Sequence, residues 1–379
     1  MGSIKNKILD FSSVGLTDMI GAGTVAIFWF YIASELGPEN YGQLTFLISI
    51  ASLSSGFALF GSNHTIWIMS AKKIDIEKTI YVLVAITSVI SSIVVFILFS
   101  NIGVSFVILS YVLLSLTIPG FLGRKLYKKY SKYMITQKVL MVILGIGLYY
   151  VFGEFGILIG ISLSYVHLLV PVLKIARKSK INFNLIKERK EFVFNNLSLS
   201  ISKTLYSSLD KLIIAPLLGY AVLGNYSLGL QFFQILSLLP HTSVKYFIAQ
   251  DATGIKNKKL KKMMVVASIG IAVLGTTIAP TVISYIFPKF IEAEDVIRII
   301  SWAVIPMTIQ STHFMPKLWA QERNRIIFYH AVVMVASQTI SILTLGSIYG
   351  SIGVAVAFLI SSIVGCGFIA LMDRITEEK

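Results

Sequence analysis

Long apolar stretches alternate with short polar segments along the whole chain. A bilayer core about 30 Å thick is crossed by a helix of about 20 mostly apolar residues. Uninterrupted apolar runs of that length favour helices over the alternating strands of a β-barrel. The pattern therefore predicts twelve transmembrane helices, with boundaries at residues 12–34, 43–62, 79–99, 102–122, 135–153, 155–173, 193–217, 222–248, 263–287, 295–318, 327–346 and 348–371.

Composition narrows the class of protein. Of the 379 residues, 55% are hydrophobic and 13% are charged, whereas an ordinary soluble domain has about 25% charged residues. Such a chain lacks the polar surface of a soluble fold, and its hydrophobicity excludes intrinsic disorder. The single cysteine, Cys366, excludes a disulfide scaffold. The predicted fold class is an all-α polytopic membrane protein.

The basic residues predict an orientation in the membrane. Lys5 and Lys7 precede the first apolar run, which is too long for a signal peptide and is followed by no A-x-A-like cleavage site, so it indicates a retained span. With the N-terminus inside, and with Lys138 counted in the inner segment before it, the inner segments hold 27 of the 33 Lys and Arg residues, and the outer segments hold only Lys289. The positive-inside rule predicts such a split. We therefore expect a cell membrane protein with both termini in the cytoplasm.

This asymmetry also accounts for the formal net charge of +15. The charge sets the topology, so nucleic acid is not expected as a partner. The most basic connection, residues 174–192, is expected to anchor the topology, with contact to anionic lipid headgroups as the alternative.

Residues 174–192 also divide the chain into two predicted six-helix bundles, residues 1–173 and 193–379. An even number of spans in each half makes the repeat parallel, related by a pseudo-two-fold axis along the membrane normal. A repeated turn supports this arrangement. The pattern L-G-x4-G joins spans one and two at residues 36–42, and it joins spans seven and eight at residues 218–224.

Motifs of common enzyme and motor chemistry are missing from the sequence. No G-x-x-x-x-G-K-[ST] phosphate loop and no H-E-x-x-H zinc motif occurs, and the histidines lack metal-ligand spacing. The predicted outer connections are too short to build an active site. We therefore expect no enzymatic activity and no bound cofactor or metal centre.

Ionisable groups inside spans are costly and mark a cavity or a charge pair. The predicted span at 193–217 is the most polar, and Lys203 lies about 15 Å from its inner end. Asp210 follows two turns outward on the same face, beside Lys211 and near Ser207. One interpretation is that Lys203 binds an anionic group of a substrate and that Lys211 and Ser207 line the same cavity. The alternative is an internal Lys–Asp pair that holds two helices together.

Three further spans carry candidate site residues. Asp18, in the first span, is either a cation or proton site or a carboxylate paired with a basic residue of a neighbouring helix. Arg298 lies near the outer boundary, where it either meets a phosphate or anchors the helix by pairing with Glu294 or Asp295. His241, in the eighth span, is a candidate polar residue of the cavity.

Two motifs resemble those of a known transporter family, the polysaccharide (O-antigen-type) flippases. The turn Leu36-Gly37-Pro38-Glu39-Asn40-Tyr41-Gly42 is similar to that family's L-G-P-E-x-Y-G turn after the first span. The segment Leu209-Asp210-Lys211-Leu212-Ile213-Ile214, followed by Leu218-Gly219, is similar to its D-K-x-x-I…L-G segment. The family belongs to the multidrug/oligosaccharidyl-lipid/polysaccharide exporter superfamily. The predicted topology resembles it over nearly the whole chain, and the motifs cover two short segments.

The resemblance implies two six-helix bundles around a central cavity. It implies a lipid-pyrophosphate-linked oligosaccharide as substrate, flipped from the cytoplasmic to the outer leaflet by alternating access. It further implies coupling to a Na⁺ or H⁺ gradient, for which Asp18 and Asp210 are candidates, and glycosyltransferase or polymerase partners in cell-surface polysaccharide synthesis. The cation-lined cavity of that family would correspond here to Lys203 and Arg298.

Two alternative functions stay open at this point. A cation-coupled exporter of small molecules or drugs, from the same superfamily, would need acidic cavity residues, and only Asp18 and Asp210 qualify. A non-transporting membrane partner in glycan assembly is the other alternative, and the polar span at 193–217 argues against it.

Overall fold

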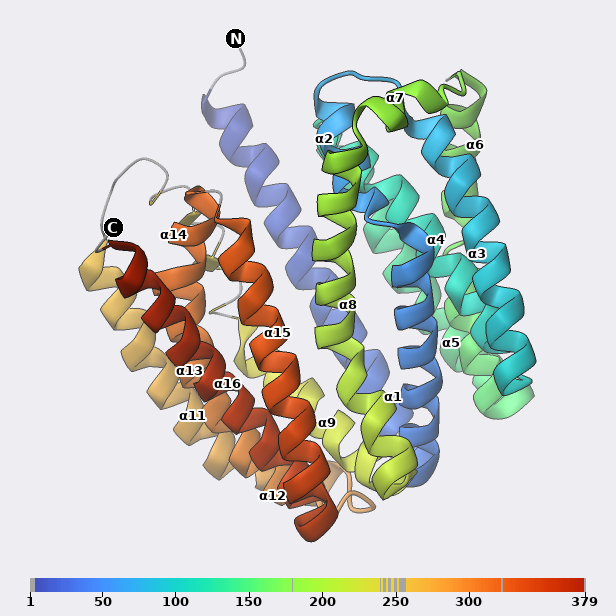
Figure 1. Cartoon of the computed structure of the whole chain (residues 1–379). Coiled ribbons are helices and arrows are strands. Elements are labelled where there is room, and N and C mark those ends of the chain that lie inside the picture. The colour runs from blue at the N-terminus through green and yellow to red at the C-terminus, as the bar shows by residue number, and fades with distance from the viewer. Residues whose placement is uncertain are drawn as a thin grey trace. The chain divides into compact units, whose positions relative to one another are not determined.

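The computed structural model consists of helices joined by short connections (Figure 1). It describes residues 4–178, 180–238, 257–321 and 323–377, together with residues 240, 243, 244, 247, 248 and 251. Every regular element in this part of the chain is a helix, as the apolar pattern predicts. The elements are α1 (Ile4–Leu59), α2 (Ser62–Ala71), α3 (Glu77–Phe99), α4 (Ile102–Gly123), α5 (Tyr127–Leu163), η1 (Val166–Leu168), α6 (Leu169–Lys178), α7 (Phe183–Glu188), α8 (Lys190–Leu218), α9 (Tyr220–Leu236), α11 (Lys258–Ile286), α12 (Ala293–Ile300), η2 (Ser301–Ala303), α13 (Val304–Ile309), η3 (Gln310–Phe314), α14 (Met315–Ala320), α15 (Asn324–Ser341), η4 (Ile342–Gly346) and α16 (Ser347–Glu377).

Contacts group the chain into two compact units. Unit 1 comprises Met1–Phe28 and Leu47–Thr204, and unit 2 comprises Trp29–Phe46 and Leu205–Lys379. These units differ from the predicted bundles of residues 1–173 and 193–379 in two places. The turn of α1 groups with unit 2, and the first half of α8 groups with unit 1.

Helix α1 doubles back on itself at a glycine. A straight helix places residues 12 apart about 18 Å from each other, yet the rings of Trp29 and Tyr41 have centroids 6.3 Å apart. The chain reverses at Gly37, whose φ of 74° and ψ of 176° fall in a region open only to glycine. Pro38 begins the returning arm, because its fixed φ and missing N–H suit the first position of a helix. Gly219, between α8 and α9, has nearly the same angles, 92° and 167°.

The two L-G-x4-G turns contact each other reciprocally within unit 2. A Cβ atom at Gly42 would lie 1.8 Å from the carbonyl oxygen of Tyr220. A Cβ atom at Gly224 would lie 1.9 Å from the carbonyl oxygen of Pro38. Gly42 therefore packs on the residue that follows Gly219, and Gly224 packs on the residue that follows Gly37. In each case the second glycine of one motif contacts the backbone just after the first glycine of the other motif. Such an exchange of contacts is what a pseudo-two-fold axis between the motifs produces.

A second pair of hairpins repeats in the same way. Gly153 in α5 has φ 61° and ψ −144°, and Gly350 in α16 has φ 54° and ψ −129°. Three residues later, a Cβ atom at Gly156 or at Gly353 would lie 2.0 Å from the carbonyl oxygen five residues before the turn. The halves therefore share two matching hairpins, of which the sequence pattern reveals only the first.

Six helical segments of the described chain are long and apolar enough to cross a membrane. They are Val14–Leu59, Glu77–Phe99, Ile102–Gly123, Tyr127–Arg177, Lys258–Ile286 and Arg325–Ile375. Three of them contain the reversals at Gly37, Gly153 and Gly350, so each of these provides two crossings. They correspond to nine of the twelve predicted spans, and the chain is a multi-pass membrane protein.

The other three predicted spans are helical but depart from an uninterrupted apolar helix. The first, 193–217, lies in α8, which is the most polar of the long helices by sequence. The second, 222–248, begins in α9, which ends at Leu236 inside the predicted span, and the described residues 238, 240, 243, 244, 247 and 248 beyond it are helical as well. The third, 295–318, is divided into α12, α13 and α14 by the 3₁₀ helix η2 and the π-helix η3. Breaks of this kind accompany prolines and functional segments of membrane helices.

One predicted boundary is wrong. The predicted cut between residues 346 and 348 falls inside a helix, because η4 continues into α16 and the chain reverses only at Gly350. The physical cause is that an apolar run marks the part of a helix that meets lipid and not the place where the helix ends. The segment 63–78, predicted to lie between two spans, contains most of the helix α2.

The reciprocal glycine contact gives a testable prediction. Replacing Gly42 by Ala places a methyl group inside the carbonyl of Tyr220, where the neighbouring atoms are backbone and cannot rotate away. We expect Gly42→Ala to lower the free energy of unfolding by about 1–3 kcal/mol, measured by reversible denaturation in detergent.

The matched control is Gly147→Ala, also within a helix. No heavy atom lies within 4 Å of a Cβ at that position. Alanine is the better helix former, so this change should leave stability equal or slightly raised. Equal effects of the two substitutions would contradict the packing argument.

Candidate functional site

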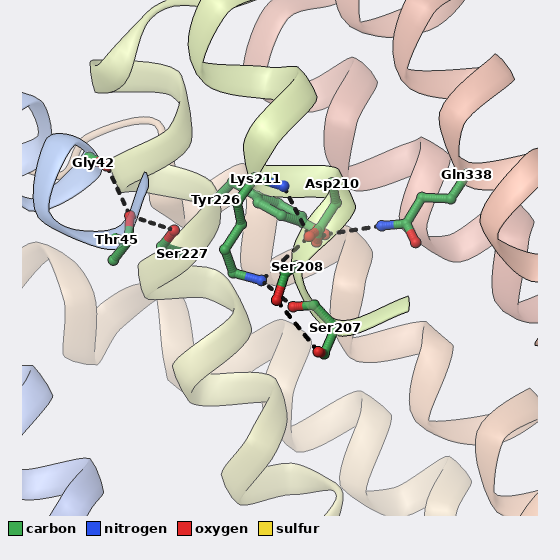
Figure 2. Close-up of polar contacts among 9 residues, drawn as sticks. All are labelled: Gly42, Thr45, Ser207, Ser208, Asp210, Lys211, Tyr226, Ser227 and Gln338. Atoms are coloured by element: carbon green, nitrogen blue, oxygen red, sulfur yellow. Dashed lines mark hydrogen bonds and ion pairs between the residues drawn. The ribbon is translucent and has the colours of Figure 1, made fainter. Parts of the chain in front are cut away.

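A polar network centred on Asp210 joins three helices of unit 2 (Figure 2). Asp210 lies in the last part of α8 and is only 7% exposed. The Tyr226 hydroxyl, on α9, donates to its Oδ2 at 2.8 Å, and Gln338, on α15, donates from Nε2 to the Tyr226 oxygen at 3.2 Å. Lys211 supplies two donors to Oδ1, its backbone N–H at 2.8 Å and its Nζ at 3.3 Å.

The partners of Asp210 explain how its buried carboxylate is tolerated. A buried carboxylate is tolerated when charge and hydrogen bonds compensate the loss of water. Here Lys211 supplies the charge, and the fully buried Tyr226 supplies a neutral donor from another helix. The ion pair therefore forms along one helix, and the contacts between helices come from Tyr226 and Gln338. This arrangement contains an internal Lys–Asp pair, although the lysine is Lys211.

Ser207 and Lys211 lie one turn apart on α8. The Lys211 Nζ donates to the Ser207 carbonyl oxygen at 3.0 Å, and the Ser207 hydroxyl lies 3.4 Å from the hydroxyl of Ser208. Ser207 is exposed and Ser208 is buried. Lys211 is thus held between the Asp210 carboxylate and a backbone carbonyl.

A second polar contact in Figure 2 connects the L-G-x4-G turn of α1 with α9. The Thr45 hydroxyl donates to the Gly42 carbonyl at 2.9 Å, and the Ser227 hydroxyl donates to the Thr45 hydroxyl at 3.3 Å. The contact extends the reciprocal glycine packing by one helical turn. Tyr226 and Ser227 are neighbours on α9, so adjacent residues serve the Asp210 network and the turn contact.

Unit 1 contains its own cluster, between α1 and α5. The Tyr130 hydroxyl donates to Asp18 Oδ1, and the Thr17 hydroxyl donates to the Ser131 hydroxyl at 2.8 Å. Asp18 is half-buried. The two interpretations of Asp18 are a cation or proton site and a pair with a basic residue. Neither of them includes the phenol donor that the structure places at Asp18.

Lys138 lies one to two turns further along the same helix pair. It follows the start of α5 by 11 residues, about 16 Å along the axis. It is half-buried, and a Cβ at Gly21 of α1 would lie 3.7 Å from its Cγ, so the glycine leaves room for the lysine chain. In the part of the chain that the structure describes, no acid and no hydrogen-bond acceptor pairs with Lys138.

The remaining candidate residues are distributed differently. Arg298, in the last turn of α12, pairs with Asp295 at 3.2 Å and with Glu294 at 3.7 Å, which are the partners that the anchor interpretation predicts. The backbone of Lys203 is helical in α8, and its side chain lies outside the described part of the structure. His241 lies outside the described residues. The structure brings Asp210, Lys211 and Ser207 together, and it places Asp18 in the other unit.

Sequence reasoning missed four residues of these clusters. Tyr226, Gln338 and Tyr130 are uncharged, so the rarity of charges inside spans does not single them out. A lone glutamine within an apolar run was the available signal for Gln338. Lys138 was counted as part of a basic inner segment, although it lies three residues inside the predicted span at 135–153.

The Asp210 network predicts energetic coupling between α8 and α9. Asp210→Asn and Tyr226→Phe each remove one partner of the same hydrogen bond, so their effects on stability should not add. We expect an interaction free energy of about 1 kcal/mol in a double-mutant cycle, measured by denaturation in detergent.

The control cycle combines Tyr226→Phe with Asp295→Asn, an exposed carboxylate on α12. These two effects should add within about 0.5 kcal/mol. Additivity in both cycles would show that the observed hydrogen bond does not couple the helices.

No protein-family model and no curated protein sequence matches the chain. Solved transporter structures do share its fold. The lipid II flippase MurJ, in an inward closed conformation, superposes with a TM-score of 0.73 at 14% identity, covering 97% of this chain and 87% of its own. An inward-facing multidrug resistance MATE family transporter of the MOP superfamily gives 0.64 at 14% identity, with 97% and 98% covered.

A MATE transporter from Vibrio cholerae, VcmN, gives a TM-score of 0.60 at 14% identity and covers 98% of both chains. The structures that the chain resembles are thus transporters, and the superposition extends over nearly all of its length. The chain therefore has an all-helical, two-bundle membrane fold similar to that of these transporter structures, as the sequence pattern predicts.

Proposed function

We propose that the chain is a transporter that flips an anionic, lipid-linked oligosaccharide of the lipid-pyrophosphate type by alternating access. The direction is from the cytoplasmic to the outer leaflet of the cell membrane, for the synthesis of a cell-surface polysaccharide or glycan. The fold supports transport, and MurJ, with the same fold, is described as a lipid II flippase. The choice of an anionic substrate rests on one observation, the unpartnered Lys138.

A lysine inside a span needs a compensating group. Lys138 is half-buried in unit 1, and no described residue pairs with it. The desolvation cost of its ammonium group is therefore not offset by a partner in the described structure. A phosphate oxygen of an incoming substrate would offset this cost by accepting a charge-assisted hydrogen bond. The glycine at position 21 keeps the α1 side of the lysine open.

Three acidic residues in or beside the spans show the opposite behaviour. Glu77 pairs with Arg124 and accepts a hydrogen bond from Ser70. Glu292 accepts a hydrogen bond from Ser351, and Asp210 is held by Tyr226 and Lys211. A drug exporter that recognises cations needs carboxylates that are ready to pair with its substrate. These three acids already have partners inside the protein, which favours an anionic substrate over a cationic one.

Lys203 stays a second candidate for a phosphate group, and Arg298, which pairs with Asp295 and Glu294, stays a separate candidate in unit 2. Lys203 belongs to unit 1, as do Lys138 and Asp18. The proposal also includes both termini in the cytoplasm, on the grounds of the 27 basic residues in the inner segments. Its partners would be the glycosyltransferases that build the lipid-linked oligosaccharide and the polymerase that consumes it.

Coupling to a Na⁺ or H⁺ gradient forms part of the proposal. Asp18 is the better-placed acid, because it is half-buried and therefore more accessible to an ion than Asp210. Asp210 is deeper and already carries Lys211 as a counter-ion. A proton or a sodium ion at Asp18 would change the charge of the α1–α5 cluster in which Lys138 lies.

The decisive experiment uses liposomes that contain a fluorescent lipid-pyrophosphate oligosaccharide. A charged donor to phosphate contributes about 1.5–3 kcal/mol, so Lys138→Gln should slow leaflet-to-leaflet transfer by about 10- to 100-fold. Lys138→Arg keeps the charge and should keep most of the rate. The matched control is Lys132→Gln, an exposed lysine on the same helix, which should transfer lipid like the wild type.

Three outcomes separate the hypotheses. Transfer that is equally fast in Lys138→Gln would remove this lysine from the site and leave Lys203→Ala as the next variant to test. Absence of transfer together with gradient-driven efflux of a small cation would replace the flippase by the exporter. Absence of both activities in a folded protein would favour the non-transporting partner.

The coupling proposal predicts a separate phenotype. Asp18→Asn keeps a hydrogen-bond acceptor for Tyr130 but cannot take up a proton or pair with sodium. We expect transfer to lose its stimulation by an imposed pH or Na⁺ gradient while a basal rate persists. Asp295→Asn, at an exposed carboxylate, is the control that keeps the stimulation. Unchanged stimulation in Asp18→Asn would exclude this residue from coupling.

A further inference from the structure

A break between α1 and α2 shapes the surface of unit 1. Phe60 and Gly61 both adopt left-handed backbone conformations, with φ of 46° and 70°. A Cβ at Gly61 would lie 2.4 Å from the backbone nitrogen of Leu197 in α8, so only glycine permits this approach. Asn196 of α8 then donates from Nδ2 to the Thr65 hydroxyl at 3.3 Å. The start of α2 is thus held against α8 by its backbone and by one side chain.

A groove remains between α2 and the neighbouring helix α3. It has a volume of about 330 Å³, which lies within the range of about 300–1,000 Å³ for ligand pockets. Its walls come from the α1–α2 break, from α3 and from α7, all in unit 1. The lining residues are Phe60, Ser62, Thr65, Ile80, Leu83, Val84, Thr87 and Ile186.

The hydroxyl groups in this lining are already engaged. The Ser62 hydroxyl donates to the Leu59 carbonyl, Thr65 donates to the Gly61 carbonyl at 3.4 Å, and Thr87 donates to the Ala58 carbonyl at 2.7 Å. The other lining residues are hydrocarbon side chains. A polar ligand would lose its hydration in this groove without gaining new donors, whereas a hydrocarbon chain loses nothing.

The outer edge of the groove belongs to a helix that faces lipid. Leu83 lines the groove and is 38% exposed, and Ile86, 55% exposed, follows on the same helix. Large apolar side chains stay exposed along most of α3 beyond that point, up to Phe99. A hydrocarbon chain can therefore enter the groove directly from the bilayer.

The short helix α7 contributes Ile186 to the groove, and basic residues lie next to Ile186 in the sequence. In Figure 1 it crosses the end of unit 1 near α2, and Ile186 packs on the same apolar core as the α2 and α3 residues. The Asn182 backbone N–H donates to the Thr79 hydroxyl at 2.8 Å, which attaches the start of α7 to α3. Arg189 directly follows the last residue of α7, and its buried Nε has no hydrogen-bond partner among the described residues. Lys187 is exposed beside it.

The wider surroundings are basic as well. Residues 72–78 and 180–189 contain six basic residues and three acidic ones. One of the three acids, Glu77, is buried and paired with Arg124. Clusters of basic residues next to membrane helices attract anionic lipid headgroups.

We propose that this groove binds one acyl chain of an anionic phospholipid, whose phosphate is held by Lys187 and Arg189. The apolar lining sets the preference for a hydrocarbon chain, and the two cations set the preference for an anionic headgroup. The site is separate from the α1–α5 cluster that contains Lys138, and it does not depend on which substrate is transported.

Native mass spectrometry of the full chain in detergent, titrated with phosphatidylglycerol or phosphatidylcholine, tests the proposal. The wild type should retain one phosphatidylglycerol molecule preferentially. Leu83→Trp fills the groove and should reduce its occupancy by about ten-fold, through the loss of buried chain area. Ile86→Trp, on the same helix but outside the lining, is the matched control and should bind like the wild type.

A second pair of variants tests the charges without altering the groove. Lys187→Gln combined with Arg189→Gln should reduce the preference for phosphatidylglycerol over phosphatidylcholine by about ten-fold. The control removes Lys128 and Lys129 instead, two exposed lysines at the start of α5. These changes leave the groove lining itself unaltered, so they test the proposal even if the tryptophan variant is unstable.

Several results would overturn the proposal. Equal retention of the two phospholipids by the wild type would exclude recognition of the headgroup. Unchanged occupancy in Leu83→Trp would place the bound lipid elsewhere. Displacement of phosphatidylglycerol by undecaprenyl phosphate, with loss of both in Leu83→Trp, would assign the groove to a polyprenyl chain rather than to a phospholipid.

Discussion

Hydrocarbon offers no hydrogen-bond partner to a peptide group, and the architecture of this protein depends on that constraint. It makes every described regular element a helix, and it requires the chain to reverse direction without leaving peptide groups exposed to lipid. Single glycines accomplish this at positions 37, 153 and 350, with backbone angles that other residues rarely adopt. The same constraint acts on side chains, because it draws Asp210, Tyr226 and Gln338 into one network between helices.

The apolar pattern predicts most of the fold because lipid contact leaves a direct trace in the sequence. Nine of the twelve predicted spans lie in helices that are apolar enough to cross a membrane, and the turns at Gly37 and Gly219 share their backbone geometry as well as their motif. Packing between helices leaves no such trace. Residues 29–46 group with unit 2, and Gly42 in this segment packs closely on Tyr220. The local sequence around Gly42 does not indicate which segment it contacts.

The candidate site likewise contains some residues that the sequence reveals and others that only the structure reveals. Asp18, Asp210 and Lys211 stand out because charges are rare in spans, and each lies in a described polar cluster. Tyr130 and Tyr226 are common residues of membrane helices, so their roles as donors to these acids become visible only in three dimensions. Lys138 shows a different difficulty. A lysine near a basic connection belongs to the inner segment by sequence, and only the start of α5 at residue 127 places it deep along a helix.

The reciprocal contact between the L-G-x4-G turns has a consequence for how the two halves diverge. In an ancestor made of two identical chains, one substitution at the second glycine would have introduced two clashes at once, one on each side of the axis. Fusion into a single chain separates the two positions, so that each can change alone. The clash at Gly42 or Gly224 is with backbone, however, and no substitution in the opposite turn relieves it. The four residues between the glycines do differ, Pro-Glu-Asn-Tyr in one turn and Tyr-Ala-Val-Leu in the other, whereas both turns keep both glycines.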